Sequence, residues 1–130
     1  MDVLSLEEYK LLALISEDIE GVYAIPIWML EEARPGHNWQ ASVPVEIRKQ
    51  VERKLSELYL SFLKRGLIDV FRFTVEGRHE LLPFNEAIEE LQNLQNFDPS
   101  PETKTLIGVM ASIDGIKALE HAKPTWYGKA

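Results

Sequence analysis

Basic side chains are concentrated in the middle third of the sequence, where they could bind phosphate groups. Residues 1–34 hold 8 acidic and 2 basic side chains, residues 35–83 hold 6 and 8, and residues 84–130 hold 7 and 4. Lysine can neutralise a phosphate, and arginine can pair with a guanine edge through two hydrogen bonds. The candidates for such contacts are Arg48, Lys49, Arg53, Lys54, Arg72, Arg78 and His79. The chain as a whole has a net charge of −7, which argues against nonspecific binding to a polyanion.

Residues suited to catalysis or to metal binding show no productive spacing. The three histidines, His37, His79 and His121, are too far apart in sequence to form a metal-ligand motif, and there is no cysteine. Adjacent glutamates such as Glu31 and Glu32 fall in expected helices, where neighbouring side chains point about 100° apart. We therefore expect a non-enzymatic protein with no cofactor and no metal.

Length and composition favour one domain in a reducing compartment. A chain of 130 residues can bury roughly two thirds of its unfolded surface without a disulfide or a metal. The start, "MDVLSLEEYK", lacks the features of a signal peptide, and no apolar run reaches the roughly 18 residues of a membrane span. The sequence predicts a soluble, cytoplasmic protein.

The first part of the chain predicts a helix, a short strand and a second helix. Ser5 and Glu8 have the spacing of a capping box, and the apolar residues that follow predict a helix ending near Ser16. "VYAI", residues 22–25, is typical of one edge strand. Pro26 is at a favoured first helical position, so we expect a second helix over residues 26–34.

A long amphipathic helix and a β-hairpin are predicted next. Apolar residues at spacings of three and four predict a helix over residues 45–65, which Gly66 ends by adopting a positive φ. "LIDVFRFTV" and "RHELLPF" then read as the two arms of a hairpin, with Gly77 in its turn. The helix thus ends sharply so that a two-stranded ribbon can fold back against it.

The exposed side of this long helix is the main candidate for binding. At about 100° per residue, Lys49 and Arg53 fall on the face opposite Leu55. Arg48 and Lys54 are expected to flank that face. Glu46, Glu52 and Glu57 are interleaved with these cations, so a solvated helix with charge pairs such as Arg53 to Glu57 would show the same pattern.

The last part of the chain predicts two more helices. Asn85 is expected to cap a helix whose stripe includes Ile88 and Leu91. A last helix is expected from Ser100 onward, with a kink or break at Asp114 and Gly115, although a strand within "TLIGVMASI" fits as well. Four apolar side chains are candidates for a partner or dimer surface, the alternative being that they cover the chain's own core: Leu60, Leu106, Met110 and Ile113.

The order of elements from residue 4 to 83 resembles the winged-helix domain, a variant of helix-turn-helix. The resemblance is carried by "GVYAIP" as the short strand, "LSELYLSFLKRGLIDV" as the third helix meeting the first wing strand, and "FRFTVEGRHELLP" as the wing. It implies that the third helix enters the major groove of DNA while the wing, with Arg72, Arg78 and His79, contacts the backbone or a minor groove.

The expected architecture is therefore mainly α with a small β-hairpin, an α+β fold in which a winged helix-turn-helix is followed by C-terminal helices. Residues 1–84 would form the winged-helix-like core, and residues 85–130 a helical extension packed on it or on a dimer partner. The resemblance implies a dimeric, cytoplasmic regulator of transcription that binds double-stranded DNA. The alternative, favoured by the acidic composition, is a winged-helix module that binds proteins and not DNA.

Overall fold

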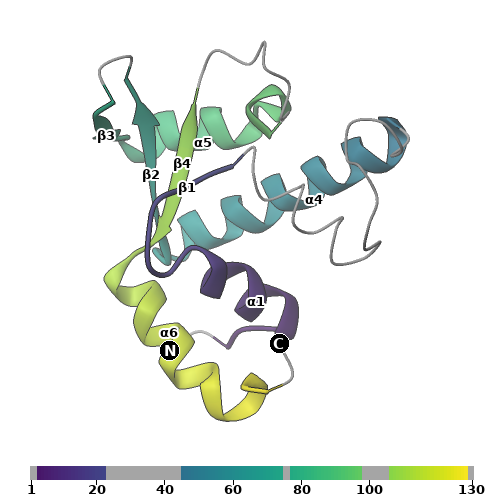
Figure 1. The fold of residues 1–130 in the computed structure, drawn as a ribbon, viewed down its shortest axis with the longest axis vertical. Coiled ribbons are helices and arrows are strands. Elements are labelled where there is room, and N and C mark those ends of the chain that lie inside the picture. Colours follow the sequence, from purple (N-terminus) through teal and green to yellow (C-terminus); the bar gives the residue numbers. More distant parts are fainter. Residues whose placement is uncertain (1–2, 23–44, 75–76, 98–105, 129–130) are drawn as a thin grey trace.

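The computed structural model describes residues 3–22, 45–74, 77–97 and 106–128, over which the chain has an α+β fold (Figure 1). The elements are α1 (Leu6–Leu14), β1 (Glu20–Gly21), α4 (Val45–Lys64), β2 (Ile68–Phe73), β3 (His79–Leu81), α5 (Phe84–Gln92), the 3-10 helix η1 (Leu94–Phe97), β4 (Ile107–Ala111) and α6 (Ile113–Trp126). The expected helix over 26–34, the connection that follows it and the expected helix start at Ser100 lie outside the described residues.

The first helix begins with the expected capping box. The amide of Glu8 donates to the Ser5 hydroxyl at 3.2 Å, and the amide of Ser5 donates to the Glu8 carboxylate at 2.9 Å. Arg65, just after α4, also binds Glu8 and the Val3 carbonyl. Although burial alone would raise the pKa of Glu8, the Ser5 amide and Arg65 lower it below its usual value. The same carboxylate therefore caps α1 and ties it to the end of α4.

The long helix and the hairpin are confirmed. α4 covers residues 45–64, and Gly66 follows with a φ of +74°, the left-handed conformation expected of a glycine that ends a helix. β2 and β3 then pair antiparallel, with Phe71 opposite Leu81 and Phe73 opposite His79. Gly77 lies in the turn with a φ of +81°. The sharp change from helix to strand is thus encoded locally, at the glycine.

Of the two structures expected for residues 107–111, the strand is confirmed as β4 and the helix is wrong. The sheet has the order β1-β4-β2-β3, so β4 lies between β1 and β2 and pairs antiparallel with both. Leu106, Val109 and Met110 happen to match a helical spacing. Alternate residues of the strand, Ile107 and Val109, are nevertheless fully buried, as the period of a strand requires.

The break predicted at Asp114 and Gly115 lies at Ser112, two residues before Asp114. The Ser112 hydroxyl accepts from the Gly115 amide at 3.0 Å, capping α6, and donates to the Gly66 carbonyl at 2.7 Å. The Asp-Gly pair therefore lies in the first turn of α6. At the other end of this helix, the Trp126 indole donates to the Leu4 carbonyl at 2.8 Å, which fixes α6 against the start of α1.

The cap expected at Asn85 is also wrong. α5 begins at Phe84 after Pro83, which has no side chain to cap it, and Asn85 is an exposed residue of the first turn. The free amides of the first turn lie at an exposed helix end, where water can bond them in place of a cap. α5 is anchored to α4 by the Ser56 hydroxyl, which donates to the Leu91 carbonyl.

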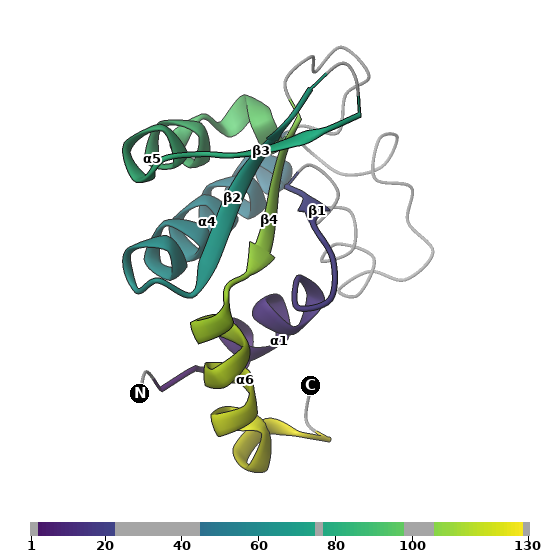
Figure 2. The same ribbon diagram turned by 90° about the vertical axis from the view of Figure 1, so that its left-hand side faces the viewer.

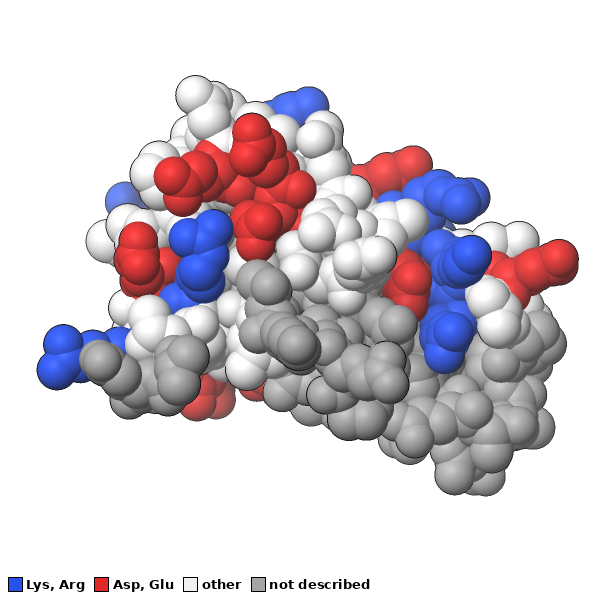
Figure 3. Space-filling view, turned by 90° about the horizontal axis from the view of Figure 1, so that it is seen from above, with Lys and Arg blue, Asp and Glu red and all other residues white. Residues whose placement is uncertain are grey.

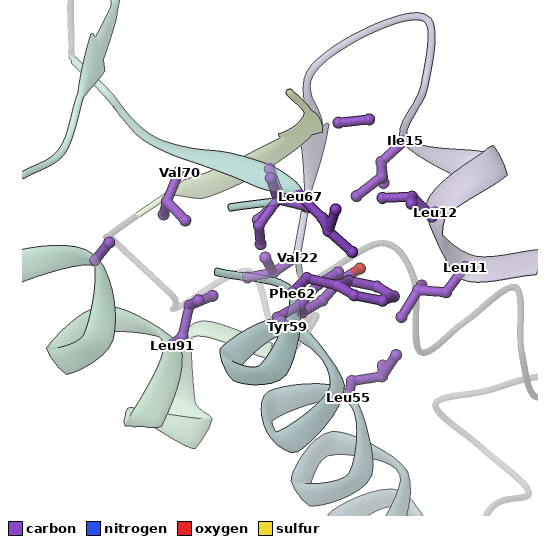
Figure 4. Packing of buried hydrophobic residues seen from close by; sticks show 14 of the residues in the cluster. Leu11, Leu12, Ile15, Val22, Leu55, Tyr59, Phe62, Leu67, Val70 and Leu91 are labelled. Carbon is purple, nitrogen blue, oxygen red and sulfur yellow. The ribbon is translucent and has the colours of Figure 1, made fainter. Parts of the chain in front are cut away.

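The helices form two groups around the sheet. α4 and α5 cover one face, while α1 and α6 pack on each other at one end of the strands (Figures 1 and 2). The core lies between α4 and the sheet, where Leu55, Tyr59 and Phe62 of α4 meet residues of α1, β2 and α5 and Val22, just after β1 (Figure 4). Residues 85–130 are thus not a purely helical extension, since they supply a central strand of this core.

Candidate nucleic-acid interface

The exposed side of α4 carries the largest group of basic side chains expected to bind phosphate. Leu55, Tyr59 and Phe62 are fully buried on one side of this helix, while Lys49 and Arg53 are exposed on the other. Figure 3 shows Lys and Arg side chains together on the right, over the amino-terminal half of α4, and acidic side chains on the left, over α5. Acidic side chains also lie among the cations on the right, and basic ones lie beside the acidic group on the left, so this side of the molecule carries mixed charge.

Lys49 and Arg53 have the geometry of a pair that could contact one ligand. They lie one helical turn apart, a rise of about 6 Å along the axis. Within the described residues neither makes an ion pair, including the possible pair between Arg53 and Glu57. The interleaved Glu52 is buried, so it contributes little to the surface that Lys49 and Arg53 share. These two positions fit a binding role best.

Arg48 and Lys54, the expected flanking residues, are less available to a ligand than Lys49 and Arg53. Arg48 is half-buried, because it precedes Leu55 by seven residues, about two helical turns, and so lies near the buried side of α4. Lys54 binds Glu7 of α1 at 2.8 Å. Both side chains of this pair are exposed, 56% and 43%, so water screens the interaction and it contributes little to stability. Lys54 can exchange Glu7 for another anion at low cost.

Arg72 does not lie on an exposed wing. Its guanidinium points to the helix-covered face of the sheet and pairs with Glu86 at 3.8 Å and Glu90 at 4.0 Å, both on α5. Arg78 is exposed in the hairpin turn. His79 packs edge-on against the ring of Phe71, with centroids 5.5 Å apart. Of the three hairpin candidates, Arg78 has the side chain most accessible to a phosphate.

The hairpin cations and those of α4 are not brought together. In Figure 1 the strands β2 and β3 lie at the left of the molecule, and the amino-terminal end of α4 lies at the right. α4 alone is 20 residues long, about 30 Å. One short stretch of duplex could therefore contact Lys49 and Arg53, whereas Arg78 would need a ligand that extends across the molecule.

The four residues expected at a partner surface lie in three places. Leu106 and Met110 lie on the sheet, on the face away from α4. Leu60 is half-buried and packs against the chain's own core. Ile113 begins α6 and is 78% exposed. The structure thus brings together only Leu106 and Met110.

A row of apolar side chains near Leu106 and Met110 escaped the sequence analysis. Residues paired across an antiparallel sheet point to the same face, and successive residues alternate. Phe71, Phe73 and Leu81 therefore share the face of Leu106 and Met110. We call this surface, formed by Ile19, Phe71, Phe73, Leu81, Leu106 and Met110, the open face. The alternation in "FRF" was the available signal, but it required β4 to be recognised as a strand.

Neither a metal site nor a membrane span is found in the part of the chain that the structure describes. No group of three or more His, Asp or Glu side chains there is placed to hold a metal ion. None of the helices in that part is both long and apolar enough to cross a bilayer. Comparison of the chain with protein-family models, curated proteins and solved structures gave no match.

Proposed function

We propose that this chain is a non-enzymatic, winged-helix-like protein that binds double-stranded DNA and regulates transcription. The observation that carries the proposal is the exposed pair Lys49 and Arg53 on α4, one turn apart, in the most basic third of an acidic protein. A helix has the width that the major groove admits, and arginine and lysine are the side chains that most often read guanine there. The agreement of residues 45–81 with the expected helix and hairpin adds support.

The proposed contact uses the amino-terminal half of α4 alone. Arg53 would face a base edge, and Lys49 and Lys54 would neutralise phosphates on either side. Arg72 takes no part, because Glu86 and Glu90 already balance its charge. Arg78 would contact a more distant part of the backbone or none. The acidic surface over α5 would face away from the duplex, since a like charge near phosphate opposes binding.

The test is selection of bound sequences from a random duplex library, followed by affinity of the enriched site at several salt concentrations. Lys49→Glu with Arg53→Glu should abolish enrichment. For each phosphate contact that is lost, the slope of log affinity against log salt should weaken by about 0.9. The matched control is Lys64→Glu with Lys117→Glu, which makes the same change in charge at exposed positions of the far end of α4 and of α6.

Retained affinity in the Lys49→Glu, Arg53→Glu protein, or equal loss in both double variants, would contradict binding through this helix face. Absence of any enriched sequence at low salt, from protein shown to be folded, would contradict DNA binding altogether.

The rival function is a protein-association module with no role in DNA binding. It is favoured by the open face, whose apolar side chains have no use in a contact with phosphate, and by the net charge of −7. In that case the double charge reversal on α4 would leave partner binding intact. The two functions therefore predict opposite outcomes for one pair of variants.

A further inference from the structure

The open face has the composition of a buried surface, not of a surface in water. On the helix-covered side of the sheet, Val70, Ile107 and Val109 are buried beneath α4 and α5. An antiparallel sheet with its other face in water normally places polar residues there. On β2 and β4, however, the positions of the open face hold Phe71, Phe73, Gly108 and Met110, and the one charged residue among them is Asp69.

Apolar side chains of this face come close together over the middle of the sheet, at Gly108. The nearest side chains above Gly108 are Ile19 and Phe73: a Cβ atom at Gly108 would lie 2.6 Å from Ile19 Cγ2 and 2.8 Å from Phe73 Cε2. Because Gly108 has no side chain, the side chains of Ile19 and Phe73 can approach each other above β4. Phe71 extends the patch to His79 through their edge-on contact.

No described helix covers this patch. Figure 2 shows α4 and α5 together on one side of the strands. Leu81 is 60% exposed and Leu106 is 39% exposed, while Phe71, Phe73 and Met110 are half-buried. Aromatic side chains and methionine at the centre of a patch, with few charges, are the features of the core of a protein–protein interface.

We infer that the open face is the contact between two copies of this chain, packed sheet to sheet about a twofold axis. Two copies with a net charge of −7 repel each other, so they can approach best through a surface that holds almost none of that charge. A twofold contact uses one self-complementary patch. The patch meets this need, because its apolar centre is flanked by opposite charges at its two ends.

The charges at the two ends also fix the orientation. Asp69 lies at one end of the face, opposite Met110, and His79 lies at the other end beside the exposed Arg78. Asp69 and Phe73 are four residues apart on β2, about 13 Å. When the β2 strands of the two copies run antiparallel across the interface, Asp69 of each copy approaches the Arg78 and His79 end of the other.

The first test is the mass of the protein in solution over a range of concentrations, measured by sedimentation. The unaltered chain should form dimers. Leu81→Lys with Leu106→Lys places two charges on the open face at exposed positions and should raise the dimer dissociation constant by about tenfold or more, which corresponds to about 1.4 kcal/mol. Leu14→Lys with Ile113→Lys adds the same charges at exposed apolar positions on α1 and α6 and should leave the dimer unchanged.

A second test checks the orientation, and it is clean because the chain has no cysteine. Asp69→Cys and His79→Cys proteins, mixed and treated with a short thiol cross-linker, should form a cross-linked heterodimer more efficiently than either protein alone. Each variant's thermal unfolding serves as the check of folding.

A monomer at every concentration would overturn the inference and leave the face to a different protein. A dimer that responds equally to both lysine pairs, or cross-linking of Asp69→Cys preferentially to itself, would overturn it too. These measurements use no DNA, so their outcome is independent of the proposed regulatory role.

Discussion

The hydroxyl of Tyr59 is a polar group that the core holds without a hydrogen-bond partner among the described residues. The side chain is fully buried, and its ring stacks on Phe97 with centroids 6.1 Å apart and planes 23° apart. The ring therefore stabilises the fold while the hydroxyl opposes it, since a buried polar group without a partner loses the hydrogen bonds that water gave it.

Tyr59→Phe should raise the free energy of unfolding by about 1 kcal/mol, because it keeps the ring and removes the unsatisfied hydroxyl. Denaturant unfolding at neutral pH measures the difference. Tyr59→Leu, which loses the stacking with Phe97, should instead be destabilising. A clear loss of stability in Tyr59→Phe would mean that the hydroxyl makes a hydrogen bond.

The same residue should give the protein a sensitivity to alkali. Burial, and secondarily the negative charge of Glu20, raise the pKa of Tyr59 well above its ordinary value near 10. The folded chain thus keeps this proton where the unfolded chain releases it. The free energy of unfolding therefore does not depend on this proton below about pH 10. Above that pH it falls by about 1.4 kcal/mol per pH unit, because the unfolded chain gives up the proton and the folded chain does not. The stability advantage of Tyr59→Phe should therefore grow above pH 10, and an advantage that is independent of pH would contradict the assignment.

At the level of single side chains, exposure was predictable from the sequence and pairing was not. The period of α4 placed Lys49 and Arg53 opposite Leu55, because a helix repeats every 3.6 residues whatever surrounds it. The partners of Lys54 and Arg72 lie 14 residues or more away along the chain, on α1 and α5. Whether these cations are available for a ligand therefore depends on how the helices pack.

Among the elements, the start of α6 depends on a close approach that only glycine permits. A Cβ atom on Gly115 would lie 2.1 Å from the Leu67 carbonyl oxygen, at the junction of α4 and β2. Leu67 also accepts a hydrogen bond from the Ser112 amide at 2.9 Å. The first turn of α6 is thus held directly against the first residues after Gly66.

Gly115→Ala should destabilise the protein by about 3 kcal/mol, because the clash is with backbone and can be relieved only by moving α6. Gly66→Ala is the comparison: its φ of +74° disfavours a side chain, but nothing lies within 4 Å of an added Cβ. That change should cost about 1–2 kcal/mol. Thermal unfolding of both variants gives the order, and a larger loss in Gly66→Ala would contradict the packing described for Gly115.

The sequence correctly predicted that Gly66 ends a helix, but it predicted a break at Gly115 and not a close contact. The difference lies in how far along the chain the cause of each glycine is found. Gly66 follows its own helix, so the local pattern reveals it. Gly115 is needed because of Leu67, 48 positions earlier, and an isolated Asp-Gly pair reads as a turn. The strand β4, for which the sequence left helix and strand open, has the same origin, since its position between β1 and β2 overrides the helical spacing of its apolar residues.

For the molecule as a whole, the predicted fold class is confirmed, but the order of strands could not be predicted. The long helix, the hairpin and the first helix carry local signals in their caps, periods and turns. The insertion of β4 between β1 and β2 joins residues from the beginning, middle and end of the chain. As a result the expected division at residue 84 cuts across one sheet and one core.

The central position of β4 gives a test at the scale of the whole chain. A fragment of residues 1–97 lacks β4 and α6, so β1 loses its strand partner and the core loses Ile107 and Val109, which are fully buried. It should show no cooperative thermal unfolding by circular dichroism, because β1 and the β2–β3 hairpin have no sheet to join. Adding a peptide of residues 98–130 should restore a cooperative transition by supplying the strand from outside. A fragment that unfolds cooperatively by itself would mean that residues 1–97 form an independent unit and that β4 only adds to a sheet already formed.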